Sequence, residues 1–188
     1  MEKIIKEARE LAYGEAEKNG TPAVPIINLS TEIGKRIAGE LGANIEIVEI
    51  GTLLMDCVLG QAIKENRQKE HIQMSYEKTD ELLKKFSILE EDKNNIKHCV
   101  LEHHGVKKFY SLESEICCNA DCYRFISVKG IFLQIRNMRE MPFEKIVEKL
   151  EEKVNEKWNA LTLDIAKNEL SIQYELIIKL LENLKVKN

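Results

Sequence analysis

The sequence has few of the residues that interrupt helices. Its 188 residues include three prolines and nine glycines, the two residue types that most strongly break regular structure. No segment keeps the two-residue alternation of a half-buried strand for long enough to predict a sheet. These deficits favour an all-α fold.

The chain also lacks an excess of positive charge and any long apolar run. Its formal net charge is −4, with acidic and basic residues interleaved, so it has no basic surface of the kind that binds nucleic-acid polymers. No apolar run approaches the roughly 18 residues that span a bilayer. Residues 1–6 alternate charged and apolar side chains, unlike a signal peptide. We therefore expect a cytoplasmic protein that associates with neither nucleic acid nor membrane.

What is present, 44% apolar and 32% charged residues, is the composition of a folded globule. A chain of this length favours one domain, which we expect to cover residues 1–188. Apolar residues at helical spacing predict about eight helices, of which the most apolar should be central and buried on most sides. Their approximate ranges are 4–12, 26–41, 45–59 (the most apolar), 71–86, 89–104, 111–123, 142–158 and 162–184, with a loop at 60–68.

Residues suited to chemistry gather in the middle third of the chain. Asp56 lies inside the most apolar segment, and Asp121 lies among cysteine and alanine residues. A carboxylate in such surroundings is costly to bury in its ionised form unless a cation or hydrogen-bond donors accompany it. His71 opens one predicted helix, and His103 and His104 end another. Together these side chains form a set that suits a divalent cation, with little discrimination among Mn, Fe, Ni, Co, Mg and Zn.

Four segments, in order, resemble motifs of the HD superfamily of metal-dependent phosphohydrolases. They are Leu53-Leu54-Met55-Asp56 for the Leu-Leu-His-Asp step, Glu70-His71 with Ser75 for the His-x-x-x-Ser segment, Val100-Leu101-Glu102-His103-His104 for the Ile-x-x-His helix end, and Leu112-Glu113 leading to Ala120-Asp121 for the Leu-Glu…Ala-Asp helix. Residues 143–184 resemble the C-terminal helical pair of small members. The resemblance therefore covers nearly the whole chain and implies an HD-like helical bundle.

The resemblance also implies site residues and substrates. By position, Asp56 and Asp121 would be the two carboxylate ligands of the metal. His71 and His103, or His104, would bind a second metal or contact the substrate phosphate. We accordingly take Asp56, His71 and His103 as candidate catalytic residues, and all five as candidate metal ligands. The implied substrates are phosphomonoesters or phosphodiesters, commonly nucleotides.

A cationic side chain lies close to these residues in the sequence. Arg124 follows Asp121 by one helical turn, which makes it the best candidate for a contact with the substrate phosphate. Lysine and arginine side chains are more often simply part of the solvated surface.

The sequence departs from the family pattern at two positions. Met55 stands where the His-Asp pair has its histidine, and its thioether is a poor ligand for a hard or borderline cation. The first histidine of the family falls at Ile26 when positions are counted back from Gly42, and no histidine precedes His71. With two imidazoles missing, the affinity for a metal should be lower by many orders of magnitude.

Cysteine offers a different ligand set. Cys57, Cys118 and Cys122 are soft ligands that could replace the missing imidazoles in a zinc-type site. However, Cys117, Cys118 and Cys122 do not form the usual Cys-x-x-Cys pair. Small buried apolar side chains, reduced in a cytoplasmic protein, are the alternative interpretation.

Each candidate also has a purely structural interpretation. Asp56 and Asp121 could be structural carboxylates that bond to helix ends, His71 could lie on the surface, and His103 and His104 could stabilise a helix C-terminus. Two functional hypotheses therefore stay open. The first is a metal-dependent phosphohydrolase that acts on phosphate esters such as nucleotides with an incomplete metal site. The second is an inactive HD-like module that binds a phosphorylated small molecule or a protein partner. The oligomeric state is not predicted.

Overall fold

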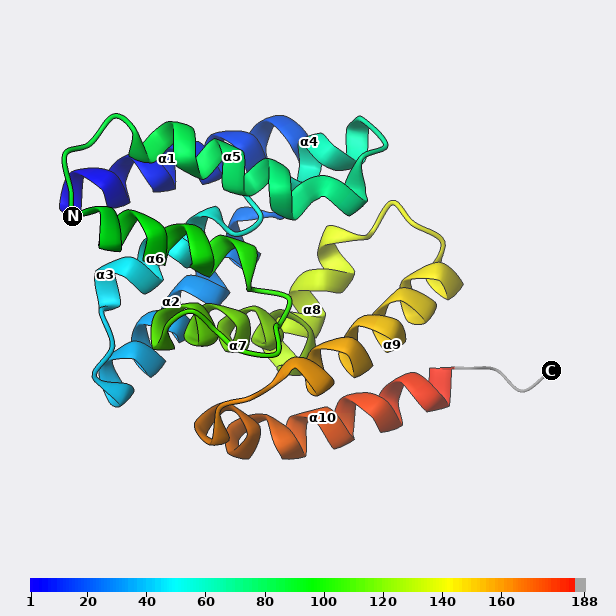
Figure 1. Ribbon diagram of the computed structural model, residues 1–188. Coiled ribbons are helices and arrows are strands. Elements are labelled where there is room, and N and C mark those ends of the chain that lie inside the picture. The colour runs from blue at the N-terminus through cyan, green and yellow to red at the C-terminus, as the bar shows by residue number, and fades with distance from the viewer. Residues whose placement is uncertain (185–188) are drawn as a thin grey trace.

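The computed structural model describes residues 1–184, and this range is all-α, with ten α-helices, one short 3-10 helix and no strand. The prediction of an all-α bundle is confirmed, with more helices than the eight expected. In chain order (Figure 1) the elements are α1 (Glu2–Asn19), α2 (Val24–Leu41), α3 (Ile45–Leu54), α4 (Leu59–Lys64), η1 (Gln68–Glu70), α5 (His71–Leu83), α6 (Glu90–Leu101), α7 (Leu112–Ile126), α8 (Val128–Asn137), α9 (Phe143–Ala160) and α10 (Asp164–Leu184).

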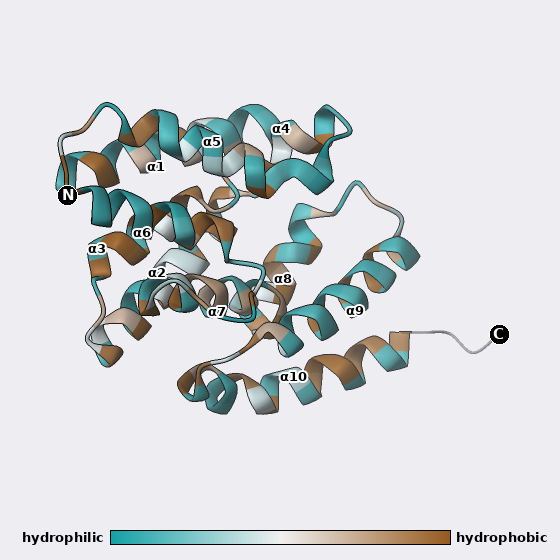
Figure 2. Cartoon of the chain, in the orientation of Figure 1, coloured by the Kyte–Doolittle hydropathy of each residue, from teal (hydrophilic) through white to brown (hydrophobic). Residues whose placement is uncertain are grey.

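Helix α3 is the centre of the bundle, as its apolar sequence predicts. It packs against α1, α2, α6 and α7, so that all residues from Ile47 to Leu54 are buried. The side chain of Asn44 starts the helix by accepting hydrogen bonds from the backbone N–H groups of Glu46 and Ile47. The outer helices α5, α6 and α9 instead turn hydrophilic faces outward (Figure 2).

The predicted helix over 45–59 ends earlier than expected. It ends at Leu54, and the chain makes a turn over residues 55–58 before α4 begins. The turn is held by i→i+3 bonds, from Cys57 N–H to the Leu54 carbonyl (3.1 Å) and from Leu59 N–H to the Asp56 carbonyl (3.0 Å). The loop predicted at 60–68 is correspondingly wrong, because its first half belongs to α4. Hydrophobicity could not reveal this break, since Met55, Cys57 and Val58 are as buried in the turn as they would be in a helix.

Helix α8 was not predicted as a separate element. Ser127 precedes and caps the helix, since its hydroxyl accepts a hydrogen bond from the Gly130 N–H (3.0 Å). The corner between α7 and α8 is so tight that a Cβ atom at Gly130 would collide with the carbonyl oxygens of Tyr123 and Arg124. This corner fixes the C-terminal end of α7, which carries the candidate site residue Arg124.

The start of α7 is the one that the sequence predicts. The Ser111 hydroxyl accepts a hydrogen bond from the Ser114 N–H (3.0 Å), and the Ser114 hydroxyl accepts one from the Ser111 N–H (3.2 Å). Most residues of the helix are buried. Helix α7 is therefore an internal element that carries Asp121 and Arg124 into the bundle.

Two groups of buried apolar residues stabilise the fold. The larger group contains residues of α1, α2, α3, α5, α6, α7 and the start of α10, and the smaller one lies among α8, α9 and α10. Tyr174 packs against both. The expectation of one domain over residues 1–188 stays a prediction. Within residues 1–184, none of the helices is both long and apolar enough to cross a bilayer.

We expect Gly51→Ala to destabilise the protein by about 1–3 kcal/mol, because an added methyl group overpacks the core. A Cβ atom at this position of α3 would lie 2.5 Å from Cys99 Cβ and 2.9 Å from Cys117 Sγ. Gly14→Ala is the matched control, since a Cβ there meets nothing within 4 Å, and helix propensity should then stabilise by up to about 1 kcal/mol. Urea unfolding of both variants measures the difference; equal effects would contradict the close packing of α3.

Candidate functional site

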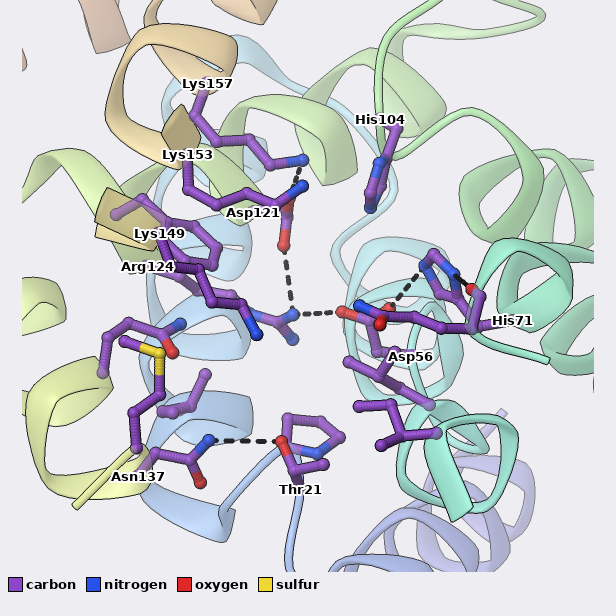
Figure 3. Close-up of a pocket in the computed structure, with 18 residues that line it drawn as sticks. Thr21, Asp56, His71, His104, Asp121, Arg124, Asn137, Lys149, Lys153 and Lys157 are labelled. Atoms are coloured by element: carbon purple, nitrogen blue, oxygen red, sulfur yellow. Dashed lines mark hydrogen bonds and ion pairs between the residues drawn. The ribbon is translucent and has the colours of Figure 1, made fainter. Parts of the chain in front are cut away.

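The candidate site surrounds Asp56 in the turn between α3 and α4. Asp121 and Arg124 reach it from α7, and Lys157 reaches it from α9, in which Lys149 and Lys153 also face the same pocket (Figure 3). His71 lies at the first position of α5, and His103 and His104 lie just after α6. Segments spread over a hundred residues of sequence thus meet in one pocket.

Four of these side chains form a buried row of alternating charge, which we call the charge chain. Arg124 Nη1 contacts Asp56 Oδ2 and lies 3.0 Å from Asp121 Oδ1, and Lys157 Nζ lies 2.7 Å from Asp121 Oδ2 (Figure 3). The four side chains are between 2% and 7% exposed. The charge chain has two negative and two positive members, so the burial of each charge is compensated by a neighbour.

These contacts decide the ionisation of both carboxyl groups. Burial alone would raise the pKa of Asp121, but Lys157 and Arg124 outweigh it and hold the pKa at about 2, below the ordinary 3.8. Burial likewise opposes ionisation of Asp56, and His103 and Arg124 nevertheless hold its pKa well below the ordinary value. Because the folded state lowers the pKa, each carboxylate stabilises the protein at neutral pH, and for Asp121 this contribution is lost as the pH falls from about 4 to about 2.

Lys157 is the member of the charge chain that is most unusual in a protein interior. Only 1% of its surface is exposed. Burial lowers the pKa of its ammonium group, but Asp121 more than reverses this and raises the pKa above its ordinary value. Lys157 is therefore a permanent internal cation.

Two imidazoles approach the other oxygen of Asp56. The Nε2 atoms of His71 and His103 each lie 3.4 Å from Asp56 Oδ1. Their Nδ1 atoms lie 2.7 Å from the backbone carbonyl oxygens of Gln68 and Val100, respectively. A carbonyl only accepts, so each Nδ1 carries a proton, and each Nε2 turns toward the carboxylate.

Asp56, His71, His103 and His104 form a group that we call the imidazole cluster. One ligand atom from each lies within 4.8 Å of all the others. Asp56 Oδ1 and His103 Nε2 are both buried and have no hydrogen-bond partner within residues 1–184. Burial, together with the neighbouring His103 and Lys157, lowers the pKa of His104 to about 3, so its imidazole is neutral at physiological pH. The donor set and the unpaired atoms fit a divalent cation.

Asp121 lies outside the imidazole cluster, because its two oxygens face Arg124 and Lys157. His98 also lies elsewhere, stacked on Tyr110 with ring centroids 4.1 Å apart and bonded to Glu102 (2.9 Å). No cysteine belongs to the cluster within the described part of the chain. All five thiols are free and buried, and burial raises the pKa of Cys57 to about 12, which keeps this thiol protonated and a poor metal ligand.

No protein-family model matches the chain, and no curated protein matches it. Solved structures do match. A protein from Lactobacillus plantarum superposes with a TM-score of 0.74 over 98% of this chain and 96% of that chain, at 16% identity. Bacillus subtilis YpgQ, solved in complex with ADP, superposes with a TM-score of 0.67 over 98% of this chain and 95% of that chain, at 15% identity. A predicted HD superfamily hydrolase from an uncultured Thermotogales bacterium superposes with a TM-score of 0.66 over 98% of this chain and 90% of that chain, at 14% identity.

This chain has the HD-superfamily fold. Identities of 14–16% establish the fold and nothing finer. The expectation of an HD-like helical bundle is thus confirmed over nearly the whole chain.

Met55 and Ile26 occupy the two positions at which the sequence lacks the histidines of the HD pattern. Met55 is completely buried, and Ile26, which is 2% exposed, lines the pocket. Neither side chain offers a nitrogen or oxygen atom to a cation. Between Asp56 and Asp121, where the resemblance places the metal, the structure has the guanidinium group of Arg124. A metal ion does not fit this position beside the guanidinium group, whereas it fits the imidazole cluster.

Sequence reasoning missed the three lysines of α9. Lys149, Lys153 and Lys157 recur at intervals of four residues, which places them on one face of the helix. The periodic signal is present in the sequence, but α9 carries many charged residues, and nothing local distinguishes an internal lysine from a solvated one.

We expect Lys157→Met to destabilise the protein by about 3–5 kcal/mol at neutral pH, because it leaves the Asp121 carboxylate partly uncompensated in the interior. Adding Asp121→Asn should restore most of the loss. Lys153→Met is the control on the same helix, since Lys153 is 24% exposed and bonds to the half-buried Glu156, and it should cost less than about 1 kcal/mol. Denaturant unfolding compares the three variants; a double variant no more stable than Lys157→Met would contradict the coupling.

Proposed function

We propose that this protein binds a phosphorylated small molecule of the nucleotide class in the pocket beside Asp56. The charge of the pocket is the observation that carries this proposal. Four cationic side chains line it, namely Arg124, Lys149, Lys153 and Lys157 (Figure 3). The two lining carboxylates are already bound to Arg124 and Lys157, so an anion entering the pocket meets an excess of positive charge.

The lysines of α9 suit a ligand with more than one phosphate group. Residues four apart on a helix are separated by about 6 Å along its axis, so Lys149, Lys153 and Lys157 form a row that leads from the outside of the pocket to Asp121. Lys157 is the inner end of this row, and Lys149 and Lys153 are half-buried nearer the solvent. A diphosphate lying along the row would contact two of these ammonium groups.

A whole nucleotide would have to occupy two adjoining cavities. The inner cavity, beside Asp56, measures about 120 Å³, below the roughly 300–1,000 Å³ of pockets that enclose a whole ligand. A neighbouring cavity of about 520 Å³ shares Thr21, Ile26 and Asn137 with it and also contains Arg136 and Arg139. We infer that the phosphate groups occupy the inner cavity and the nucleoside the outer one.

A neighbour in fold supports this proposal. YpgQ was solved in complex with ADP. We also propose a cytoplasmic location, because the five cysteines are free and buried, as is usual in a reducing compartment.

We expect ADP to bind, and Lys149→Gln and Lys153→Gln each to weaken its affinity about tenfold at low salt, because each removes one charge-assisted contact. Higher salt should reduce both effects. Lys145→Gln is the control on the same helix, since Lys145 is 64% exposed and lies outside the pocket. Isothermal titration calorimetry measures the affinities. No binding of ADP, or an equal loss in the Lys145 variant, would contradict this site.

The imidazole cluster favours a second candidate function, metal-dependent hydrolysis of the bound phosphate ester. A divalent cation held there would supply a Lewis acid that polarises a phosphoryl oxygen and activates a water molecule. Asp56, His103 and His104 would hold it, which leaves the Nε2 atom of His71 free. Arg124, whose Nη2 has no hydrogen bond to the described residues, would orient the phosphate. The His71 imidazole, 12% exposed at the pocket surface, would accept the proton of the attacking water.

We expect hydrolysis of p-nitrophenyl phosphate or nucleotides in the presence of Mn²⁺. His71→Ala and His103→Ala should each reduce turnover by at least about 100-fold, because the first removes the proton acceptor and the second removes a metal ligand. His98→Gln should leave turnover unchanged, because His98 lies outside the cluster. Phosphate release with Mn²⁺, Ni²⁺ or Co²⁺ measures the activity. Absence of turnover with every cation would refute hydrolysis and leave the binding function intact.

A further inference from the structure

The carboxylates of Asp56 and Asp121 face a common space that could hold a cation, and the guanidinium group of Arg124 occupies it. Arg124 Nη1 bonds to Asp56 Oδ2 and forms an ion pair with Asp121 Oδ1 at 3.0 Å, and Arg124 Nε donates to the Ser30 hydroxyl (3.2 Å). Ser30 is itself fixed on α2, where its hydroxyl donates to the Ile27 carbonyl (3.0 Å). The guanidinium group therefore has a fixed position, with 3% of the side chain exposed.

Lys157 completes the neutralisation of the two carboxylates. It lies 2.7 Å from the Asp121 oxygen that Arg124 does not contact, so both oxygens of Asp121 face cations. Arg124 and Lys157 together carry two positive charges, the same as one divalent metal ion. A metal added between the carboxylates would have no uncompensated negative charge to bind and would be repelled by both side chains.

We infer that Arg124 and Lys157 together replace a divalent metal ion between Asp56 and Asp121. The two aspartates are then held together by protein cations, and the core of the site forms independently of metal supply. This inference goes beyond the proposed function, because it concerns the carboxylate pair and holds whether or not the imidazole cluster binds a metal.

The proposal predicts that removing both cations creates a metal site. In Arg124→Met/Lys157→Met, two ionised carboxylates are left in the interior, and Mn²⁺ should now compensate them. We expect this variant to melt well below the wild type in EDTA and to gain about 5–10 °C when Mn²⁺ exceeds its dissociation constant about a hundredfold. Scanning calorimetry with EDTA and with MnCl₂ measures the two melting temperatures.

The Mn²⁺ response must depend on Asp121. Adding Asp121→Asn to the double variant should abolish the new response, whereas any response of the wild type, which would come from the imidazole cluster, should not change on Asp121→Asn/Lys157→Met. Arg36→Met is the matched surface control. Arg36 also bridges two carboxylates, Glu40 and Glu169, but it is 36% exposed, and its removal should create no Mn²⁺ response.

A failure to fold in EDTA does not remove the test. In that case the variant is refolded with and without Mn²⁺, and the helical circular dichroism signal is measured. Recovery that requires Mn²⁺ and Asp121 supports the replacement. A double variant whose melting temperature or refolding yield responds to Mn²⁺ no more than the wild type, or whose response survives Asp121→Asn, overturns it.

Discussion

Two ionised carboxylates are buried within a few ångströms of each other, and the rest of the site is arranged to make this possible. Asp56 and Asp121 belong to different helical segments, and each would be too costly to bury without a cation. Arg124 supplies one cation from α7, and Lys157 supplies the other from α9. The charge chain therefore links the central turn after α3 to the C-terminal helices, whose apolar contacts form a largely separate group. The contact between Lys157 and Asp121 thus joins α9 to α7 inside the pocket.

Much of the fold could be predicted from the sequence, because helical periodicity records which face of each segment is buried. Segments with one polar face, such as α2 and α9, were located to within a few residues. The errors occurred where this contrast fails. Residues 45–59 are mostly apolar, and their apolar character continues through the turn at 55–58, so the break at Met55 leaves no periodic signal. Helix α8 begins immediately after α7, and a corner that depends on the close approach of Gly130 to a carbonyl group is a tertiary feature.

The sequence predicts which residues belong to the candidate site better than it predicts which of them contact each other. Resemblance in order and spacing selected Asp56, His71, His103 and His104, and the structure brings them within 4.8 Å of one another. It also selected Asp121, as a metal ligand, and the spacing of one helical turn from Asp121 selected Arg124 as a phosphate contact. Neither signal indicates that the two side chains bind each other. Lys157 could not be predicted at all, since its burial depends on Asp121, 36 positions earlier, and a lysine on a charged helix looks solvated. Pairings between distant charged side chains are decided by packing.

Asp56 connects the two halves of the site through its two oxygens. Oδ2 binds Arg124, whereas Oδ1 faces the Nε2 atoms of His71 and His103 and makes no hydrogen bond to any residue from 1 to 184. The guanidinium group therefore satisfies one oxygen and leaves the other available to the imidazole cluster. Any cation bound by the cluster would share the Asp56 charge with Arg124, which weakens its binding relative to a site with an unshared carboxylate. An anionic ligand faces the opposite situation, because Arg124 and the α9 lysines attract it whether or not a metal is present. The electrostatics of this site thus favour anion binding over metal binding, and metal-dependent chemistry is the more demanding of the two functions.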